Sequence, residues 1–190
     1  MKRTVWLVRH PPVTLAWQKR CYGQSDPGLS REGARLASDL IDTLAKLSPD
    51  IVIHSGLRRT RAIAEALARR TGATLLPEPR WRERHFGQWE GQSWHAIYRA
   101  TGNAMDGMLT EPHSFRPGGG ETTAEMWDRT RLAWEALPPC PRIAVISHGG
   151  PIACVRALRQ NGTIDLLPKL IPAPGEILTI ELVPMGIENS

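Results

Sequence analysis

Thr4-Val5-Trp6-Leu7-Val8-Arg9-His10 is a short apolar run that ends in an arginine and a histidine. The run is too short to span a membrane, and its length suits a buried strand of a parallel sheet. Arg9 and His10 would then emerge at the carboxyl end of the strand, where open α/β folds bind their ligands. A histidine can act there as nucleophile, base or metal ligand, and an arginine can bind an oxyanion through a bidentate fork. The pair indicates phosphate chemistry only if the rest of the chain supports it, because most Arg-His pairs have no such role.

Three later segments supply the other groups that a phosphohistidine reaction needs. Residues 51–61 form a second apolar run, a small-residue turn and an arginine cluster that opens a predicted helix, and helix N-termini attract anions. Residues 81–91 place the carboxylate of Glu83 among arginines, aromatics and glycines. Residues 143–151 form an apolar strand that delivers His148 to a glycine turn and a following helix. The chain therefore offers further cations, a second histidine and a proton donor.

Together and in this order, the four segments resemble the histidine phosphatase superfamily, the phosphoglycerate-mutase-like enzymes, over residues 4–182. The resemblance implies a nucleophile that becomes phosphorylated, a proton donor, and three side chains that hold the phosphoryl oxygens. These are, in the same order, His10, Glu83, and the set Arg9, Arg59 and His148. Arg58 directly precedes the matching arginine, so an assignment one position earlier stays open.

The chemistry of these residue types agrees with that assignment. An imidazole attacks phosphorus only when it is neutral, and neighbouring cations such as Arg9 and Arg59 lower the pKa of His10. The same guanidinium groups would stabilise the equatorial oxygens of an in-line transition state. Glu83 would give the departing alcohol a proton and later deprotonate the water that hydrolyses the phosphohistidine. Aromatic neighbours favour its protonated form and the adjacent arginines oppose it, so its protonation state stays open.

One segment departs from the family pattern, because Pro11-Pro12-Val13-Thr14 follows His10 where the family usually has glycine. Proline fixes φ and removes a backbone N–H, so this loop is stiffer and has fewer donors near the substrate. A proline-containing loop here resembles some alpha-ribazole-phosphatase-like members, as does Cys-Tyr-Gly-Gln-Ser-Asp at residues 21–26. Phe-Gly-Gln-Trp-Glu-Gly at residues 86–91 resembles the phosphatase branch more than the mutases.

We therefore expect a metal-independent phosphomonoesterase that acts through a phosphohistidine on a small phosphorylated metabolite. The resemblance makes alpha-ribazole 5′-phosphate of cobalamin biosynthesis the first candidate. We expect substrate contacts from Tyr22, Gly23 and Gly149, and stacking surface for a flat heterocycle from Tyr22, His85 and Trp89. The alternatives are a broad-specificity histidine acid phosphatase, a phosphoglycerate mutase, or a non-enzymatic module that binds a phosphate ligand or nucleic acid.

Composition narrows the partners and the location. A net charge of +5 would suit nucleic acid, yet the arginines lie in the motifs or on predicted helix faces, and positive charge also steers phosphorylated substrates. We expect a small phosphorylated substrate, no nucleic-acid partner and no membrane partner, while a homodimer stays open. The 6 histidines show no metal-ligand spacing, so we expect no metal and no cofactor. The 3 widely spaced cysteines indicate reduced thiols and the N-terminal apolar run is too short for a signal peptide, which predicts a cytoplasmic enzyme.

Strand and helix signals alternate along the chain, which predicts an α/β fold with a mostly parallel central sheet flanked by helices on both faces. On the resemblance this fold is phosphoglycerate-mutase-like, and residues 1–190 form a single histidine phosphatase domain. Ser30 predicts a helix N-cap and Gly72 a helix C-cap, and residues 74–76 and 177–183 predict strands.

The segment at residues 102–120 is rich in glycine, proline, asparagine and threonine, which predicts a flexible loop. The resemblance offers another interpretation, in which this segment lies near the site entrance. In that case Glu121 and Thr122 would order a lid or touch the leaving group.

Overall fold

A five-stranded sheet with the strand order β3-β2-β4-β1-β5 forms the centre of the computed structural model, which describes residues 3–182. Four strands run parallel, namely β1 (Arg3–Arg9), β2 (Ile51–His54), β3 (Thr74–Pro77) and β4 (Arg142–Ser147). The edge strand β5 (Ile177–Leu182) is antiparallel to β1. The predicted mostly parallel sheet is therefore confirmed.

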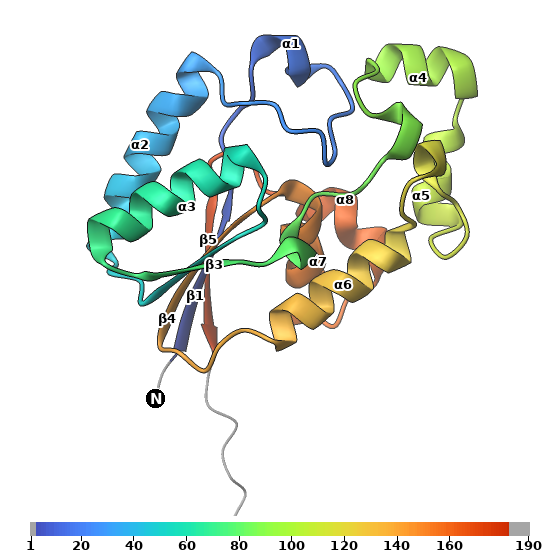
Figure 1. Cartoon of the computed structure of the whole chain (residues 1–190). Coiled ribbons are helices and arrows are strands. Elements are labelled where there is room, and N and C mark those ends of the chain that lie inside the picture. Colours follow the sequence, from blue (N-terminus) through green and yellow to red (C-terminus); the bar gives the residue numbers. More distant parts are fainter. Residues whose placement is uncertain (1–2, 183–190) are drawn as a thin grey trace, which may run out of the picture.

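Helices cover both faces of this sheet (Figure 1). On one face lie α2 (Arg31–Lys46) and α3 (Arg58–Thr71), and on the other α6 (Thr123–Glu135) and α7 (Gly149–Arg159). The shorter helices are α1 (Leu15–Gln18), α4 (Trp94–Thr101), α5 (Gly107–Thr110) and α8 (Leu167–Leu170). Figure 1 shows α1 and α4 beyond the end of the sheet opposite the N-terminus, which is the carboxyl end of β1. The predicted α/β architecture with helices on both faces is confirmed.

The apolar run of β1 is buried on both of its faces. Successive side chains of a strand point to opposite sides, and Trp6 and Val8 pack with the helices α2 and α3. Val5 and Leu7 pack on the other side with α6 and α7. Because both faces are covered, the strand is apolar at every position rather than at alternate ones.

The ends of two helices agree with the sequence. The Ser30 side chain accepts a hydrogen bond from the backbone N–H of Gly33 at 2.9 Å and caps α2. Gly72 ends α3 with φ at 74°, in the left-handed region that favours glycine. Both predicted caps are confirmed. The strand predicted at residues 74–76 is β3, and the one at 177–183 is β5, although Val183 lies outside the described residues.

Residues 102–120 form short turns packed on the rest of the molecule. They contain α5 and the 3₁₀ turns Ala104–Asp106 and Pro117–Gly119. Thr122 caps α6, because its side chain accepts from the backbone N–H of Glu125 at 3.1 Å and the Glu125 carboxylate accepts from its N–H at 2.9 Å. Thr122 is thus the first residue of a capping box at the start of α6.

None of the helices formed by residues 3–182 is long and apolar enough to cross a membrane.

Candidate active site

Three adjacent strands bring distant segments of the chain together at their carboxyl ends. His10 follows β1, Ser55 follows β2 and His148 follows β4, and β4 lies between β2 and β1. Because the three strands are parallel, their ends meet at one edge of the sheet, where α/β folds place their ligands. The ring centroids of His10 and His148 are 5.1 Å apart.

His10 is almost fully buried and its ring is held in one orientation. Its Nδ1 lies 2.7 Å from the carbonyl oxygen of Pro11. A carbonyl can only accept, so Nδ1 carries the proton and Nε2 keeps its lone pair. Burial, Arg59 and Arg9 lower the pKa of His10 to about 3, against the opposing effect of the hydrogen bond to Pro11. The ring is therefore neutral at physiological pH, and burial is the largest single cause.

Arg59 reaches inward from the first turn of α3. Its Nε donates to Nε2 of His10 at 3.3 Å, and its Nη1 and Nη2 donate to the carbonyl oxygens of Ser25 at 2.8 Å and Gly23 at 2.6 Å. The preceding residue, Arg58, is exposed at the start of the same helix. The structure thus places Arg59, and not Arg58, against His10.

His148 is fully buried, and its Nε2 lies 2.8 Å from the hydroxyl of Ser55, which in turn lies 2.8 Å from the hydroxyl of Thr60. Its Nδ1 is buried and has no hydrogen-bond partner among residues 3–182. Burial, Arg59 and His10 lower the pKa of His148 well below its usual value. Ser55, which sequence reasoning missed, thus holds one ring nitrogen of His148 in place.

Arg9 and Tyr22 complete this side of the site. Arg9 donates from Nη1 to the carbonyl of Pro172 at 2.5 Å, and its buried Nε has no partner within the described residues. The Tyr22 ring stands edge-on to His10, with centroids 6.3 Å apart, and the Arg59 guanidinium carbon lies 5.1 Å from its centroid.

Glu83 belongs to a segment between two 3₁₀ turns, Pro79–Trp81 and Gly87–Trp89. Its two carboxylate oxygens accept from the backbone N–H of Gly150 at 3.2 and 3.3 Å, and one of them accepts from the N–H of Arg84 at 3.0 Å. Gly150 lies in the first turn of α7, where unpaired N–H groups attract a carboxylate. A Cβ on Gly150 would lie 2.4 Å from the Glu83 carboxylate, so glycine permits this close approach.

A cavity of about 360 Å³ lies between these groups. Five of the predicted site residues line it, namely Arg9, Tyr22, Gly23, Glu83 and Gly149. The other three, His10, Arg59 and His148, are nearly or fully buried beside it. The eight residues therefore gather in one region at the carboxyl end of the sheet.

The aromatic lining of the cavity differs from the prediction. Tyr22 lines it together with Phe86 and Trp94. Trp89 instead packs into a small hydrophobic cluster around Cys21, and His85 is not part of the lining. The prediction of Trp89 and His85 as stacking surface is wrong because the 3₁₀ turn Gly87–Trp89 directs the indole inward, which sequence spacing alone did not indicate.

Glu90 is a supporting residue that sequence reasoning missed. One oxygen accepts from the N–H groups of Gln24 at 3.0 Å and Phe86 at 3.1 Å, and the other from the N–H of Ser25 at 2.6 Å and its hydroxyl at 2.7 Å. The loop that it holds supplies the carbonyls that bind Arg59. The Trp-Glu-Gly motif at residues 89–91 contains Glu90 and is the signal in the sequence that points to it.

Metal ligands do not gather at this site. Within residues 3–182, no group of three or more histidine, cysteine, aspartate or glutamate side chains is placed to hold a metal ion.

Comparison with known proteins identifies the family. Residues 5–188 match the model of the histidine phosphatase superfamily, branch 1. The chain belongs to this superfamily. A glucosyl-3-phosphoglycerate phosphatase of Mycobacterium tuberculosis is 30% identical over 166 residues, which cover 82% of this chain and 74% of the relative. A Serratia proteamaculans protein named "Probable phosphoglycerate mutase GpmB" is 30% identical over 154 residues, which cover 80% of this chain and 72% of the relative.

Solved structures agree with this membership. The mycobacterial glucosyl-3-phosphoglycerate phosphatase has a TM-score of 0.81 at 26% identity, covering 95% of this chain and 91% of that one. The alpha-ribazole phosphatase of Shigella flexneri has a TM-score of 0.85 at 19% identity with the same coverage, which is a likeness of fold alone. The prediction of a phosphatase-family enzyme is confirmed. The activity of the protein is that of a phosphatase or mutase on a phosphorylated small molecule.

Proposed function

We propose that the protein hydrolyses phosphate monoesters of small organic alcohols through a phosphohistidine on His10. The observation that carries the proposal is the neutral His10 ring, whose lone pair on Nε2 lies beside the guanidinium of Arg59. The buried Nε of Arg9, a residue that lines the cavity, is a further donor for a phosphoryl group. Glu83 supplies a carboxyl group that lines the same cavity.

The first chemical step transfers the phosphoryl group to the enzyme. Nε2 of His10 attacks phosphorus while the bond from phosphorus to the alcohol oxygen breaks, and protonated Glu83 gives its proton to that oxygen. Arg9 and Arg59 stabilise the charge on the equatorial oxygens of the transition state. The products of this step are the free alcohol, phosphohistidine and an ionised Glu83.

The second step regenerates the enzyme. Ionised Glu83 takes a proton from a water molecule while the water oxygen attacks phosphorus. The bond between phosphorus and Nε2 breaks, the electron pair returns to His10, and inorganic phosphate leaves. Glu83 is then protonated again for the next substrate.

We propose alpha-ribazole 5′-phosphate as the preferred substrate, with its flat benzimidazole against the aromatic lining of Tyr22, Phe86 and Trp94. Stacking adds about 0.5–1.5 kcal/mol beyond burial, which corresponds to a preference of up to about tenfold. The relatives named for glucosyl-3-phosphoglycerate make that ester the main competitor. The ester 3-phosphoglycerate is the competitor that distinguishes a mutase.

The intermediate is tested on the purified protein by rapid-quench labelling from a phosphorylated substrate. We expect an acid-labile and base-stable phosphoryl adduct in the wild type and none in His10→Ala, whose rate should fall by about 10⁴-fold or more. Circular dichroism should show that the variant keeps the fold. Wild-type turnover in folded His10→Ala would refute the proposal.

The substrate is tested by measuring kcat/KM for alpha-ribazole 5′-phosphate, glucosyl-3-phosphoglycerate, 3-phosphoglycerate and p-nitrophenyl phosphate. A lead of about tenfold for the ribazole ester supports the proposed substrate. Equal values for all natural esters would leave a broad-specificity phosphatase. Conversion of 3-phosphoglycerate to its 2-isomer faster than phosphate release would assign the protein as a mutase.

A further inference from the structure

The segment that carries Glu83 has no helix or strand of its own. Residues 82–86 connect the 3₁₀ turns Pro79–Trp81 and Gly87–Trp89. Regular elements pair their own backbone carbonyls, and a carbonyl left unpaired away from water costs about 1–3 kcal/mol. The partners of this segment must therefore come from elsewhere in the chain.

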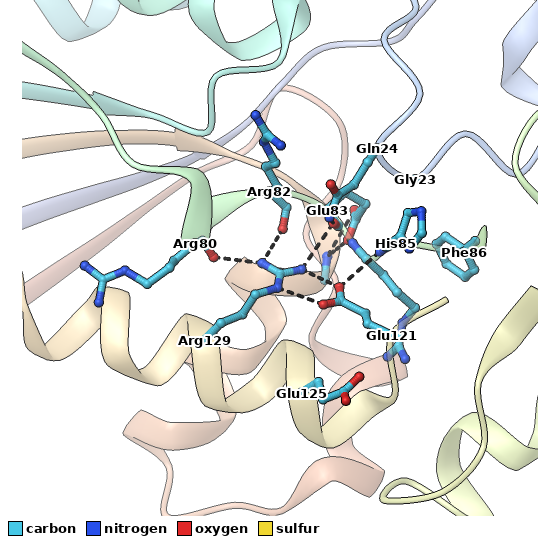
Figure 2. Close-up of polar contacts among 12 residues, drawn as sticks. Gly23, Gln24, Arg80, Arg82, Glu83, His85, Phe86, Glu121, Glu125 and Arg129 are labelled. Carbon is cyan, nitrogen blue, oxygen red and sulfur yellow. Dashed lines mark hydrogen bonds and ion pairs between the residues drawn. The ribbon is translucent and has the colours of Figure 1, made fainter. Parts of the chain in front are cut away.

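Arg129 of α6 supplies partners for two of these carbonyls and for one carbonyl of the preceding turn (Figure 2). Its Nη1 donates to the carbonyl oxygens of Arg80 and Arg82, both at 2.7 Å, and its Nη2 donates to that of Glu83 at 3.1 Å. Figure 2 shows the guanidinium pointing from α6 toward this segment. A planar guanidinium has five donors in a fixed geometry, so it fixes the relative positions of the three carbonyls.

Glu121 holds both this guanidinium and the next part of the segment. Its carboxylate oxygens lie 2.5 and 2.9 Å from Nη2 and Nε of Arg129, a bidentate pair whose side chains are only 15% and 19% exposed. The backbone of His85 is paired at both groups, because its N–H donates to the Glu121 carboxylate at 3.0 Å and its carbonyl accepts from the Glu121 N–H at 2.9 Å. Charge-assisted bidentate pairs have a strong geometric preference.

The glycines before Glu121 allow this close contact. A Cβ on Gly120 would lie 2.1 Å from the carbonyl oxygen of His85, and a Cβ on Gly118 would lie 2.3 Å from that of Phe86. Residues 118–120 thus pack directly on the backbone of the Glu83 segment. This contact places the end of the stretch predicted as a flexible loop, residues 102–120, against the Glu83 segment.

We propose that Arg129 and Glu121 are positioning residues for Glu83. Their ion pair holds the backbone of residues 80–85 so that the Glu83 carboxylate reaches the N–H of Gly150 at the cavity. Neither Arg129 nor Glu121 lines the cavity, so their effect on the reaction is transmitted through Glu83. The inference rests on the proposed role of Glu83 as the proton donor.

The first test compares Arg129→Met with Arg131→Met. Arg131 lies on the same helix but pairs only with surface carboxylates at Asp128 and Glu135. A misplaced proton donor slows poor leaving groups, so Arg129→Met should lower kcat for glycerol phosphate by about 10- to 100-fold and for p-nitrophenyl phosphate by less than about threefold. Arg131→Met should leave both rates within about twofold. Equal losses on both substrates in Arg129→Met would overturn the inference.

The second test is the double variant Arg129→Met/Glu83→Gln. If Arg129 acts through Glu83, the double variant should cleave glycerol phosphate as fast as Glu83→Gln alone, because the donor has already been removed. Losses that multiply would show a structural role unrelated to Glu83 and would overturn the inference. A substrate-dependent loss in Glu83→Gln but not in Arg129→Met would overturn this inference only. No substrate-dependent loss in Glu83→Gln would instead refute the proposed role of Glu83 as the proton donor.

Thermal melts accompany each variant. If Arg129→Met does not fold, Glu121→Gln serves in its place, because its amide oxygen can still accept from His85 while the charge that holds Arg129 is lost. We expect the same substrate-dependent loss, at about 3- to 10-fold on glycerol phosphate. A folded Glu121→Gln with equal rates on both substrates would overturn the inference.

Discussion

The two sides of the active site are built in different ways. On the nucleophile side, His10 and His148 follow directly from neighbouring strands, and their positions are set by the backbone hydrogen bonds of the sheet. On the acid side, Glu83 sits on a segment without regular structure, which is held by the side chain of Arg129 from α6 and by the first turn of α7. A sheet is a cooperative element that one substitution rarely dissolves, whereas a single side-chain clamp can be removed by one substitution. The nucleophile side is therefore the more robust of the two.

On each side, one charged side chain holds the backbone of the segment that carries or binds a catalytic residue. Glu90 accepts backbone N–H groups of residues 24 and 25 and so fixes the loop that holds Arg59. Arg129 donates to backbone carbonyls of the Glu83 segment. Both residues act on the main chain rather than on substrate, so the two sides can be disturbed separately.

The largest separable effect is expected from Glu83→Gln. A general acid contributes about 10²- to 10⁴-fold when the leaving group is a poor one. We expect a loss of that size on glycerol phosphate and a loss below about tenfold on p-nitrophenyl phosphate, whose leaving group needs little protonation. Steady-state kcat values on the two esters measure this difference. Matching losses would count against Glu83 as the donor. The Glu83 segment would then have no assigned role in proton transfer.

Arg59→Met should damage the nucleophile side and leave this ratio of substrates unchanged. The phosphoryl group is common to both esters, so we expect kcat/KM to fall by about 10²- to 10³-fold on each. The matched control is Arg58→Met, one residue away but exposed, which should change kcat/KM by less than about twofold. A larger loss in Arg58→Met than in Arg59→Met would assign the phosphate contact to Arg58 instead.

Glu90→Gln should lower kcat/KM on both esters, as Arg59→Met does, but by a smaller factor. An amide nitrogen would face the N–H groups of residues 24 and 25, so the loop and Arg59 would shift. We expect kcat/KM to fall about 5- to 10-fold on both esters alike. The control is Glu65→Gln on the outer face of α3, where the carboxylate lies 3.7 Å from Arg61 at the surface. A loss confined to glycerol phosphate would place Glu90 with the acid side instead.

The last prediction concerns stability and pH rather than turnover. The pKa of His10 is about 3 in the folded protein against 6.5 for the free residue, so below about pH 6.5 the unfolded chain binds a proton that the folded chain does not. The free energy of unfolding should therefore fall as the pH drops from 7 to 4, by at most about 1.4 kcal/mol per pH unit for this group. His54 and His148 act in the same direction. Urea unfolding at several pH values should give a shallower fall in His10→Gln, and an unchanged slope would contradict the low pKa.

Local sequence patterns determined the strands, the helix caps and the residues at the carboxyl ends of the strands. An apolar run followed by Arg9-His10 or by His148 has one reasonable place in a parallel sheet, because strand ends and ligand sites coincide there. The caps at Ser30 and Gly72 follow from side-chain chemistry and backbone conformation within a few residues. The family resemblance added Glu83, whose own neighbours in the sequence left its protonation state open.

Only the tertiary structure decided which residues hold the catalytic groups in place. Arg129 binds carbonyls 46 to 49 residues away, and Glu90 binds N–H groups 65 and 66 residues away. Such bonds to backbone atoms depend on no particular side chain in the partner segment, so they leave no pairwise pattern in the sequence. For the same reason Trp89 was predicted to stack on a substrate, whereas the turn before it sends the ring into the core. In an irregular segment, long-range packing sets the direction of a side chain. The hydrophobic periodicity of the sequence does not predict that direction, because such a segment has no regular repeat.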